Sequence, residues 1–135
     1  MAKPKLLLID DEPALGGFVA HAARASGYDV LITTESNSFR QHYNLHNPAA
    51  ISLDLGIPGG DGVEMLRFLA GQKCTAPILI ISGFDKRVLA SAFSLGEAMG
   101  LRMVGPFNKP VRLQQLKETF AVLRNECSSQ SGMEP

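Results

Sequence analysis

Short apolar runs that end beside polar side chains constrain the fold of this chain more than any other feature. Four of them are typical of buried strands: Lys5 to Ile9, Ile51 to Leu53, Ile78 to Ile81 and Leu101 to Val104. The polar residues at or after their ends are Asp10, Asp11, Asp54, Ser82 and Lys109. Because the C-terminal ends of neighbouring parallel strands share one crevice, these side chains are predicted to converge there.

Helix-like segments separate the apolar runs. The first is predicted to begin near Pro13, because proline has no N–H to leave unpaired at the first helical position, and to end at Gly27. The segment from Tyr28 to Thr33 is more polar and indicates an edge strand. The other predicted helices are Ser36 (as the cap) to about His46, Val63 to about Gln72, Asp85 (as the cap) to about Met99, and Val111 to about Asn125. Five strands alternating with five helices predict an α/β fold with a doubly wound parallel sheet.

Helical spacing predicts which face of each helix is buried. In the helix after Asp85 the expected buried stripe is Val88, Ala92, Leu95 and Met99. Continuous apolar strands fit a sheet that is covered on both faces.

Length and composition indicate one domain. The 135 residues are 45% hydrophobic, and we expect a single domain over residues 1–125 with a flexible C-terminal tail, 126–135. A formal net charge of +0 gives no electrostatic footprint for nucleic acid and no reason to expect a membrane surface. Cys74 and Cys127 have no metal-ligand spacing and fit reduced thiols, and no apolar stretch approaches the roughly 20 residues that span a bilayer. We therefore expect a cytoplasmic protein.

Three carboxylates in one crevice predict a cation site. Like charges oppose each other's ionisation, and a hard divalent cation relieves that repulsion. Mg²⁺ usually takes one or two carboxylates and keeps several waters, so Asp11 and Asp54 are expected as direct ligands and Asp10 partly through water. The backbone carbonyl of Gly56 could complete the protein's share of the ligands.

Phosphoryl chemistry fits the same crevice. Asp54 is a possible nucleophile, because carboxylates form acyl phosphates. Phosphoryl transfer needs mainly positioning and charge neutralisation, which Lys109 and the Ser82 hydroxyl could supply with the cation. We suspect a cis bond between Lys109 and Pro110, since X-Pro bonds adopt cis at modest cost.

These residues resemble the receiver domain of bacterial two-component response regulators. The matching segments are Leu-Leu-Ile-Asp10-Asp11-Glu12, Leu53-Asp54-Leu-Gly-Ile-Pro58-Gly-Gly-Asp61-Gly62, Ile81-Ser82-Gly83 and Lys109-Pro110. The resemblance implies a flavodoxin-like sheet with strand order 2-1-3-4-5. It implies that Asp54 accepts a phosphoryl group, with Mg²⁺, from a sensor histidine kinase or phosphotransfer protein and so controls an output protein or effector domain. By the same resemblance Asp10 and Asp11 hold the metal, Ser82 is the switch hydroxyl and Lys109 contacts the phosphate. The domain would assist its own phosphorylation and dephosphorylation without being an enzyme.

Two features of the strand before Lys109 depart from the family. An aromatic switch residue usually stands three positions before the lysine, where this chain has Pro106, and Phe107 is expected to face the opposite way. Pro106 fits either a strand terminator or a functional change, since proline is excluded from central strands. The segment from Leu101 to Pro110 also resembles, faintly, receivers attached to cyclic-di-GMP phosphodiesterase modules.

Two other functions remain open from the sequence. A Mg²⁺-dependent phosphohydrolase with an aspartyl nucleophile would usually carry a second carboxylate two residues later, where this chain has Gly56. A protein-interaction module that works without phosphate is suggested by Pro106. His42 and His46 lie four apart on a predicted helix and could bind a metal, but two histidines without a third ligand more often form a solvated surface.

Overall fold

A computed structural model describes residues 3–55, 62–83 and 86–133 of the chain. Within these residues five strands alternate with five helices. The strands are β1 (Lys5–Ile9), β2 (Asp29–Thr33), β3 (Ala50–Asp54), β4 (Ile78–Ser82) and β5 (Met103–Asn108). The helices are α1 (Pro13–Ala25), α2 (Ser36–His46), α3 (Gly62–Gly71), α4 (Lys86–Ala98) and α5 (Leu113–Met133). The strands pair in parallel in the order β2-β1-β3-β4-β5, which confirms the predicted sheet.

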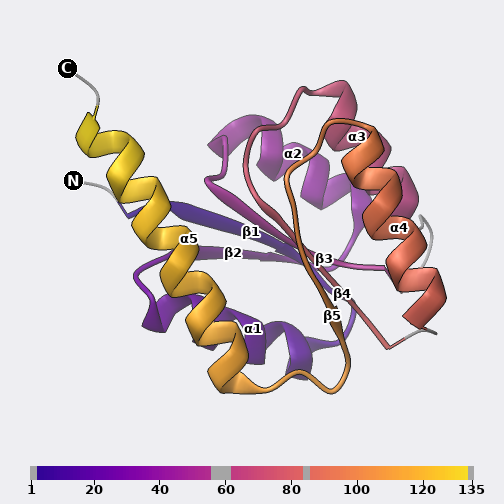
Figure 1. Ribbon diagram of the computed structural model, residues 1–135, viewed down its shortest axis with the longest axis horizontal. Coiled ribbons are helices and arrows are strands. Elements are labelled where there is room, and N and C mark those ends of the chain that lie inside the picture. Colours follow the sequence, from indigo (N-terminus) through magenta and orange to yellow (C-terminus); the bar gives the residue numbers. More distant parts are fainter. Residues whose placement is uncertain (1–2, 56–61, 84–85, 134–135) are drawn as a thin grey trace.

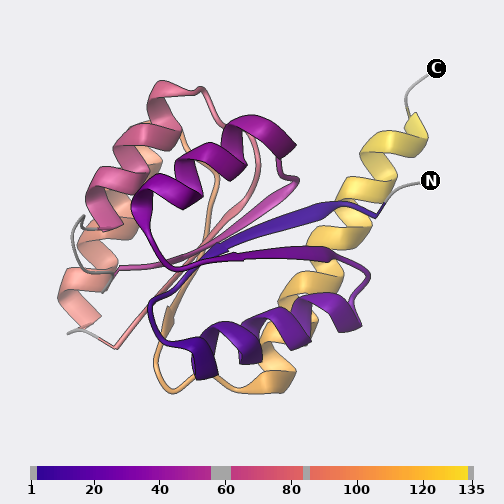
Figure 2. The same cartoon turned by 180° about the vertical axis from the view of Figure 1, so that it is seen from behind.

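Helices cover both faces of this sheet (Figures 1 and 2). Helices α1 and α5 lie on one face, and α2, α3 and α4 lie on the other. Alternate residues of β1 point to opposite layers: Leu6 and Leu8 pack in the cluster with α1 and α5, whereas Leu7 and Ile9 pack in the other. Two covered faces explain why the central strands are apolar at every position instead of alternating with polar residues.

Strand β5 runs further than the sequence predicted. The strand was expected to end at Val104, yet it continues through Pro106 to Asn108. Proline is tolerated because β5 is an edge strand and because a bulge interrupts its pairing with β4. Val104 and Phe107 pair with Leu79 and Ile81 of β4. One residue of β4 lies between these partners, whereas two residues of β5, Gly105 and Pro106, lie between Val104 and Phe107. Gly105 lies in this bulge, and its φ of +106° is a conformation that glycine adopts readily.

The buried face of α4 is also different from the predicted stripe. Leu89, Ala92 and Gly96 are buried, whereas Val88 and Leu95 are 51% and 38% exposed. Gly96 faces β5, where a Cβ would collide with the Met103 sulfur, so the glycine leaves room for the Met103 side chain. The missing side chain lets the helix approach the strand closely, and Val88 and Leu95 turn towards solvent.

Several helices begin or end at other residues than predicted. Glu35, not Ser36, is the N-cap of α2, and Ser36 is the first helical residue. Helix α5 continues to Met133, so residues 126–133, predicted as flexible tail, are helical. No proline stands between Asn125 and Met133 to interrupt the helix. The predicted cap Asp85 lies outside the described residues.

Candidate functional site

The end of β1 fixes Asp10. The backbone N–H of Asp10 donates to the carbonyl of Thr33 on β2 at 3.1 Å, and the Thr33 hydroxyl donates back to the Leu8 carbonyl at 2.7 Å. The N–H of Glu12 donates to Asp10 Oδ1 at 2.8 Å. Asp10 is 5% exposed, so its carboxylate is held in place beneath the surface of the crevice.

Asp10, Asp11 and Asp54 converge as the sequence predicted. Each offers an oxygen, and these oxygens lie within 4.8 Å of one another. Asp54, the last residue of β3, is 3% exposed, whereas Asp11 is exposed. An all-carboxylate set with one member open to solvent suits a hard, partly hydrated divalent cation. Gly56, the fourth predicted ligand, lies outside the described residues.

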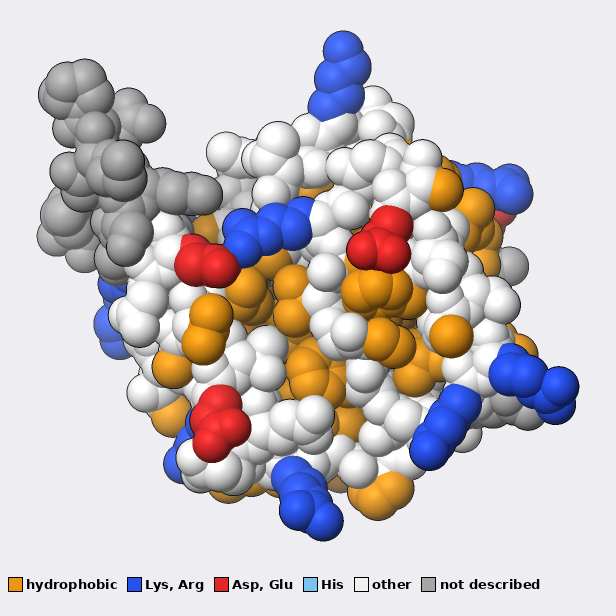
Figure 3. Space-filling view, in the orientation of Figure 1, with side chains coloured by type: hydrophobic (Ala, Val, Ile, Leu, Met, Phe, Trp, Pro, Cys, Tyr) orange, Lys and Arg blue, Asp and Glu red, His pale blue; other side chains and the backbone are white. Residues whose placement is uncertain are grey.

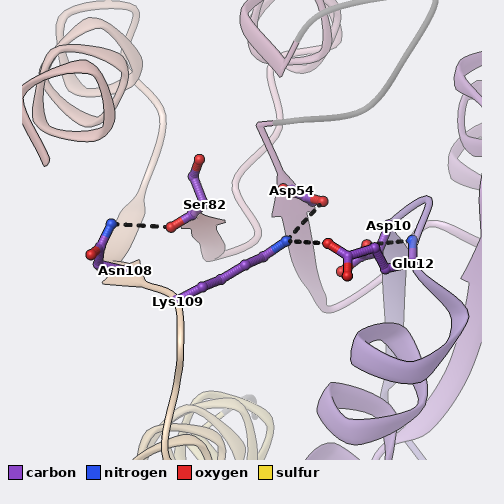
Figure 4. A network of polar contacts seen from close by, with 6 residues as sticks. All are labelled: Asp10, Glu12, Asp54, Ser82, Asn108 and Lys109. Carbon is purple, nitrogen blue, oxygen red and sulfur yellow. Dashed lines mark hydrogen bonds and ion pairs between the residues drawn. The ribbon is translucent and has the colours of Figure 1, made fainter. Parts of the chain in front are cut away.

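Lys109, the residue after β5, reaches this cluster (Figure 4). Its backbone N–H donates to the carbonyl of Ser82 at 2.9 Å, and the bond to Pro110 is cis, as predicted. Its Nζ lies 3.4 Å from Asp54 Oδ2 and 3.2 Å from Glu12 Oε1. Burial lowers the pKa of Lys109, but the carboxylates of Asp54 and Glu12 outweigh it and raise the pKa overall. Lys109 therefore remains a cation directed at Asp54.

The carboxyl of Asp10 is the strongly perturbed acid of this group. Burial raises the pKa of Asp10 to about 6, the Glu12 N–H opposes that shift, and the charge of Asp54 adds to it. The folded protein therefore binds a proton more tightly than the unfolded chain between about pH 4 and pH 6. Without a bound metal ion, ionisation of Asp10 lowers the free energy of unfolding.

We expect Asp10→Asn to stabilise the metal-free protein at neutral pH. The raised pKa means that the wild type loses unfolding free energy as the pH rises, by up to about 3 kcal/mol at pH 7.5, and the neutral amide avoids this loss. Chemical denaturation in EDTA, followed by circular dichroism at pH 4 and pH 7.5, measures the effect. Near-equal stabilities at pH 4 and a more stable variant at pH 7.5 are expected. A variant less stable at pH 7.5 would contradict this account of Asp10.

Ser82 lies at the same end of the sheet. It is the last residue of β4, fully buried, and the preceding residue Ile81 pairs with Asp54 on β3. Its carbonyl also accepts a hydrogen bond from the Asn108 side chain at 3.2 Å, which ties the ends of β4 and β5 together (Figure 4). Ser82, Asp54 and Lys109 therefore lie at adjacent strand ends, while the role of the Ser82 hydroxyl stays a prediction.

The residues before Lys109 differ from the family pattern in structure as well as in sequence. Pro106 is exposed, while Phe107 is 6% exposed and packs in the core cluster with α1 and α5. Phe107 thus faces the layer of α1 and α5 and not that of α4. A ring at position 107 cannot turn into the space beside Ser82 without leaving that core.

Two contacts at the site were missed by sequence reasoning. Glu12 was noted only as part of the matching segment, and Asn108 was not singled out. Glu12 follows the two aspartates directly and so carries a usable signal, namely a third acidic residue at the crevice. The Asn108 contact depends on the bulge in β5, which no spacing in the sequence reveals.

The histidine pair stays apart from this site. His42 and His46 lie on α2 with ring centroids 5.7 Å apart, and His42 Nδ1 lies 2.8 Å from the Ser38 carbonyl. Within the described part of the chain no third histidine, cysteine or carboxylate joins them to complete a group of metal ligands.

Among the described residues, no helix has the length and apolar character needed to cross a bilayer.

Comparison with known proteins identifies the family. Residues 6–121 match the model of the response regulator receiver domain. The transcriptional regulatory protein TrcR of Mycobacterium tuberculosis is 28% identical over 130 residues, covering 96% of this chain and 48% of that protein. The alkaline phosphatase synthesis transcriptional regulatory protein PhoP of Bacillus subtilis is 30% identical over 82 residues, covering 61% of this chain and 34% of that protein.

A solved structure agrees with these relatives. The response regulator from Colwellia psychrerythraea has a TM-score of 0.81 at 28% identity, covering 93% of this chain and 99% of that one. This chain spans about half the length of TrcR and about a third of PhoP. The finer resemblance to receivers of cyclic-di-GMP phosphodiesterases stays a prediction. The chain belongs to the family of response regulator receiver domains, which are signalling modules of two-component systems rather than enzymes.

Proposed function

We propose that Asp54 is the phosphoacceptor of this receiver domain and that Mg²⁺ is its cofactor. The observation that carries the proposal is the placement of Lys109 Nζ 3.4 Å from Asp54 Oδ2, beside the three clustered carboxylates. A nucleophilic carboxylate flanked by a cation and a metal site has what phosphoryl transfer requires, namely positioning and charge neutralisation.

Each residue of the site has a separate proposed role in phosphoryl transfer. Asp11 and Asp54 would bind Mg²⁺ directly, Asp10 partly through water, and the Gly56 carbonyl would complete the set. The metal would neutralise charge on the incoming phosphoryl group. Lys109 holds a positive charge beside Asp54, and the Ser82 hydroxyl would bind a phosphoryl oxygen.

A sensor histidine kinase or a phosphotransfer protein is the proposed donor. The phosphoryl group carries about −1.5 to −2 charge at neutral pH and replaces one carboxylate charge. The backbone N–H of Lys109 and the side chain of Asn108 both donate to the Ser82 carbonyl. A displacement of Ser82 or Lys109 would therefore also move the end of β5. We therefore propose that the first step of the switch is a movement of the chain at the ends of β4 and β5.

The proposed output surface lies over β5. Figure 3 shows hydrophobic side chains in the middle of the face between α5 and α4, with charged side chains around them. Met103 and Val104 are half-buried there, and Gly105 and Pro106 are exposed. An output protein or effector domain is proposed to bind this face, with an affinity that depends on phosphorylation.

A test of this function uses a small phosphodonor. With acetyl phosphate and Mg²⁺, intact-mass spectrometry is expected to show one added phosphoryl group per chain. Chelating the metal with EDTA should abolish the adduct, because the three carboxylates then repel the anionic donor. Equal labelling in EDTA would exclude the proposed metal, and no labelling under any condition would exclude the phosphoacceptor role.

A further inference from the structure

Glu12 has an unusual position at the mouth of the site. It is the N-cap residue of α1, but its side chain makes no capping hydrogen bond. Glutamate is not a preferred N-cap, where serine, threonine, aspartate and asparagine satisfy the free N–H groups. Its carboxylate instead reaches across the crevice to Lys109 Nζ at 3.2 Å, a residue 97 positions away in sequence.

Lys109 therefore has two carboxylate partners of different kinds. The side chain of Asp54 is 4% exposed and fixed at the end of β3, whereas that of Glu12 is 62% exposed. Exposed ion pairs contribute little stability and exchange easily with water or with another anion. Figure 4 shows the ammonium between these two groups. The contact to Glu12 is the one that can be released.

We propose that Glu12 is a positioning residue that holds the Lys109 ammonium in the resting state and thereby slows phosphorylation of Asp54. The inference rests on the proposed function. In the reaction an Asp54 carboxylate oxygen forms a bond to phosphorus, and the bond from phosphorus to the donor oxygen breaks, so that acetate leaves with the electron pair. Lys109 must give up Glu12 to pair with the phosphoryl oxygens as their charge arrives.

The negative charge of Glu12 would also slow phosphorylation, as its contact with Lys109 does. An anionic donor approaches a crevice that already holds three carboxylates, and Glu12 is a fourth at its rim. Removing its charge lowers this repulsion and frees Lys109 for the phosphoryl group. Glu12 also attracts Mg²⁺, so the comparison is made at saturating Mg²⁺, where a weaker metal affinity no longer affects the rate.

The decisive variant is Glu12→Gln, which keeps the size of the side chain and removes its charge. Its adduct with acetyl phosphate is expected to form about 2- to 5-fold faster than that of the wild type, the range of an exposed ion pair. Glu35→Gln is a matched control, because Glu35 is the N-cap of α2 and also makes no capping hydrogen bond. Its rate should equal that of the wild type.

Salt separates this role from a merely structural one. The rate ratio between Glu12→Gln and the wild type should fall towards one as the ionic strength rises, since exposed charges are screened. An unchanged or slower variant, or a ratio that salt does not alter, would overturn the inference while labelling of the wild type still supports the proposed function. A wild type that takes up no phosphoryl group would overturn both.

Discussion

Asp54→Asn is expected to form no phosphoryl adduct with acetyl phosphate and Mg²⁺ under conditions that label the wild type. The asparagine amide has nearly the same shape but lacks the anionic oxygen that attacks phosphorus. It also removes one of the three charges that attract the metal. Intact-mass spectrometry over a time course measures the loss.

Asp29→Asn is the matched control for this substitution. Asp29 is exposed at the start of β2, at the opposite end of the parallel sheet from the site. The control should label as fast as the wild type. Equal labelling of Asp54→Asn and the wild type would show that another residue accepts the phosphoryl group.

Lys109→Met is expected to slow adduct formation by about 100-fold at saturating Mg²⁺. The substitution keeps a long flexible side chain and removes the positive charge that lies 3.4 Å from Asp54. Loss of one preorganised group that stabilises developing negative charge commonly costs a factor of this size. A quenched time course with acetyl phosphate gives the rate constant.

The stability of Lys109→Met provides a second, independent readout. Without metal, Asp54 and Asp10 lose a neighbouring cation, and the unfolding free energy should fall by about 1–3 kcal/mol. Added Mg²⁺ should restore much of that stability but not the rate. Lys117→Met on α5, where the lysine is also half-buried, should change neither. A rate within twofold of the wild type would remove Lys109 from the proposed mechanism.

The sheet and the acidic cluster could be predicted because both depend on simple patterns. Buried parallel strands need apolar residues at every position, so β1, β3 and β4 stand out in the sequence. Parallel strands then bring their ends together, which places Asp10, Asp54 and Lys109 at one crevice. The family resemblance supplied the strand order, which periodicity alone does not contain.

The errors arose where packing between elements decides the outcome. The buried face of α4 depends on the space that Gly96 leaves for Met103, and a single helix does not reveal that contact. Strand β5 passes through Pro106 because it is an edge strand with a bulge, which is a property of the assembled sheet. Glu12 lies next to two recognised aspartates, but its contact with Lys109 depends on the path of β5.

Reductive mapping of the phosphoryl adduct tests the central claim most directly. Borohydride reduces an acyl phosphate to an alcohol, so a phosphorylated aspartate becomes homoserine and can be located by peptide mass spectrometry. The account predicts homoserine at position 54 in samples treated with acetyl phosphate and Mg²⁺, and none in samples treated in EDTA. Homoserine at Asp10 or Asp11, or a phosphoryl group on any other side chain, would contradict it.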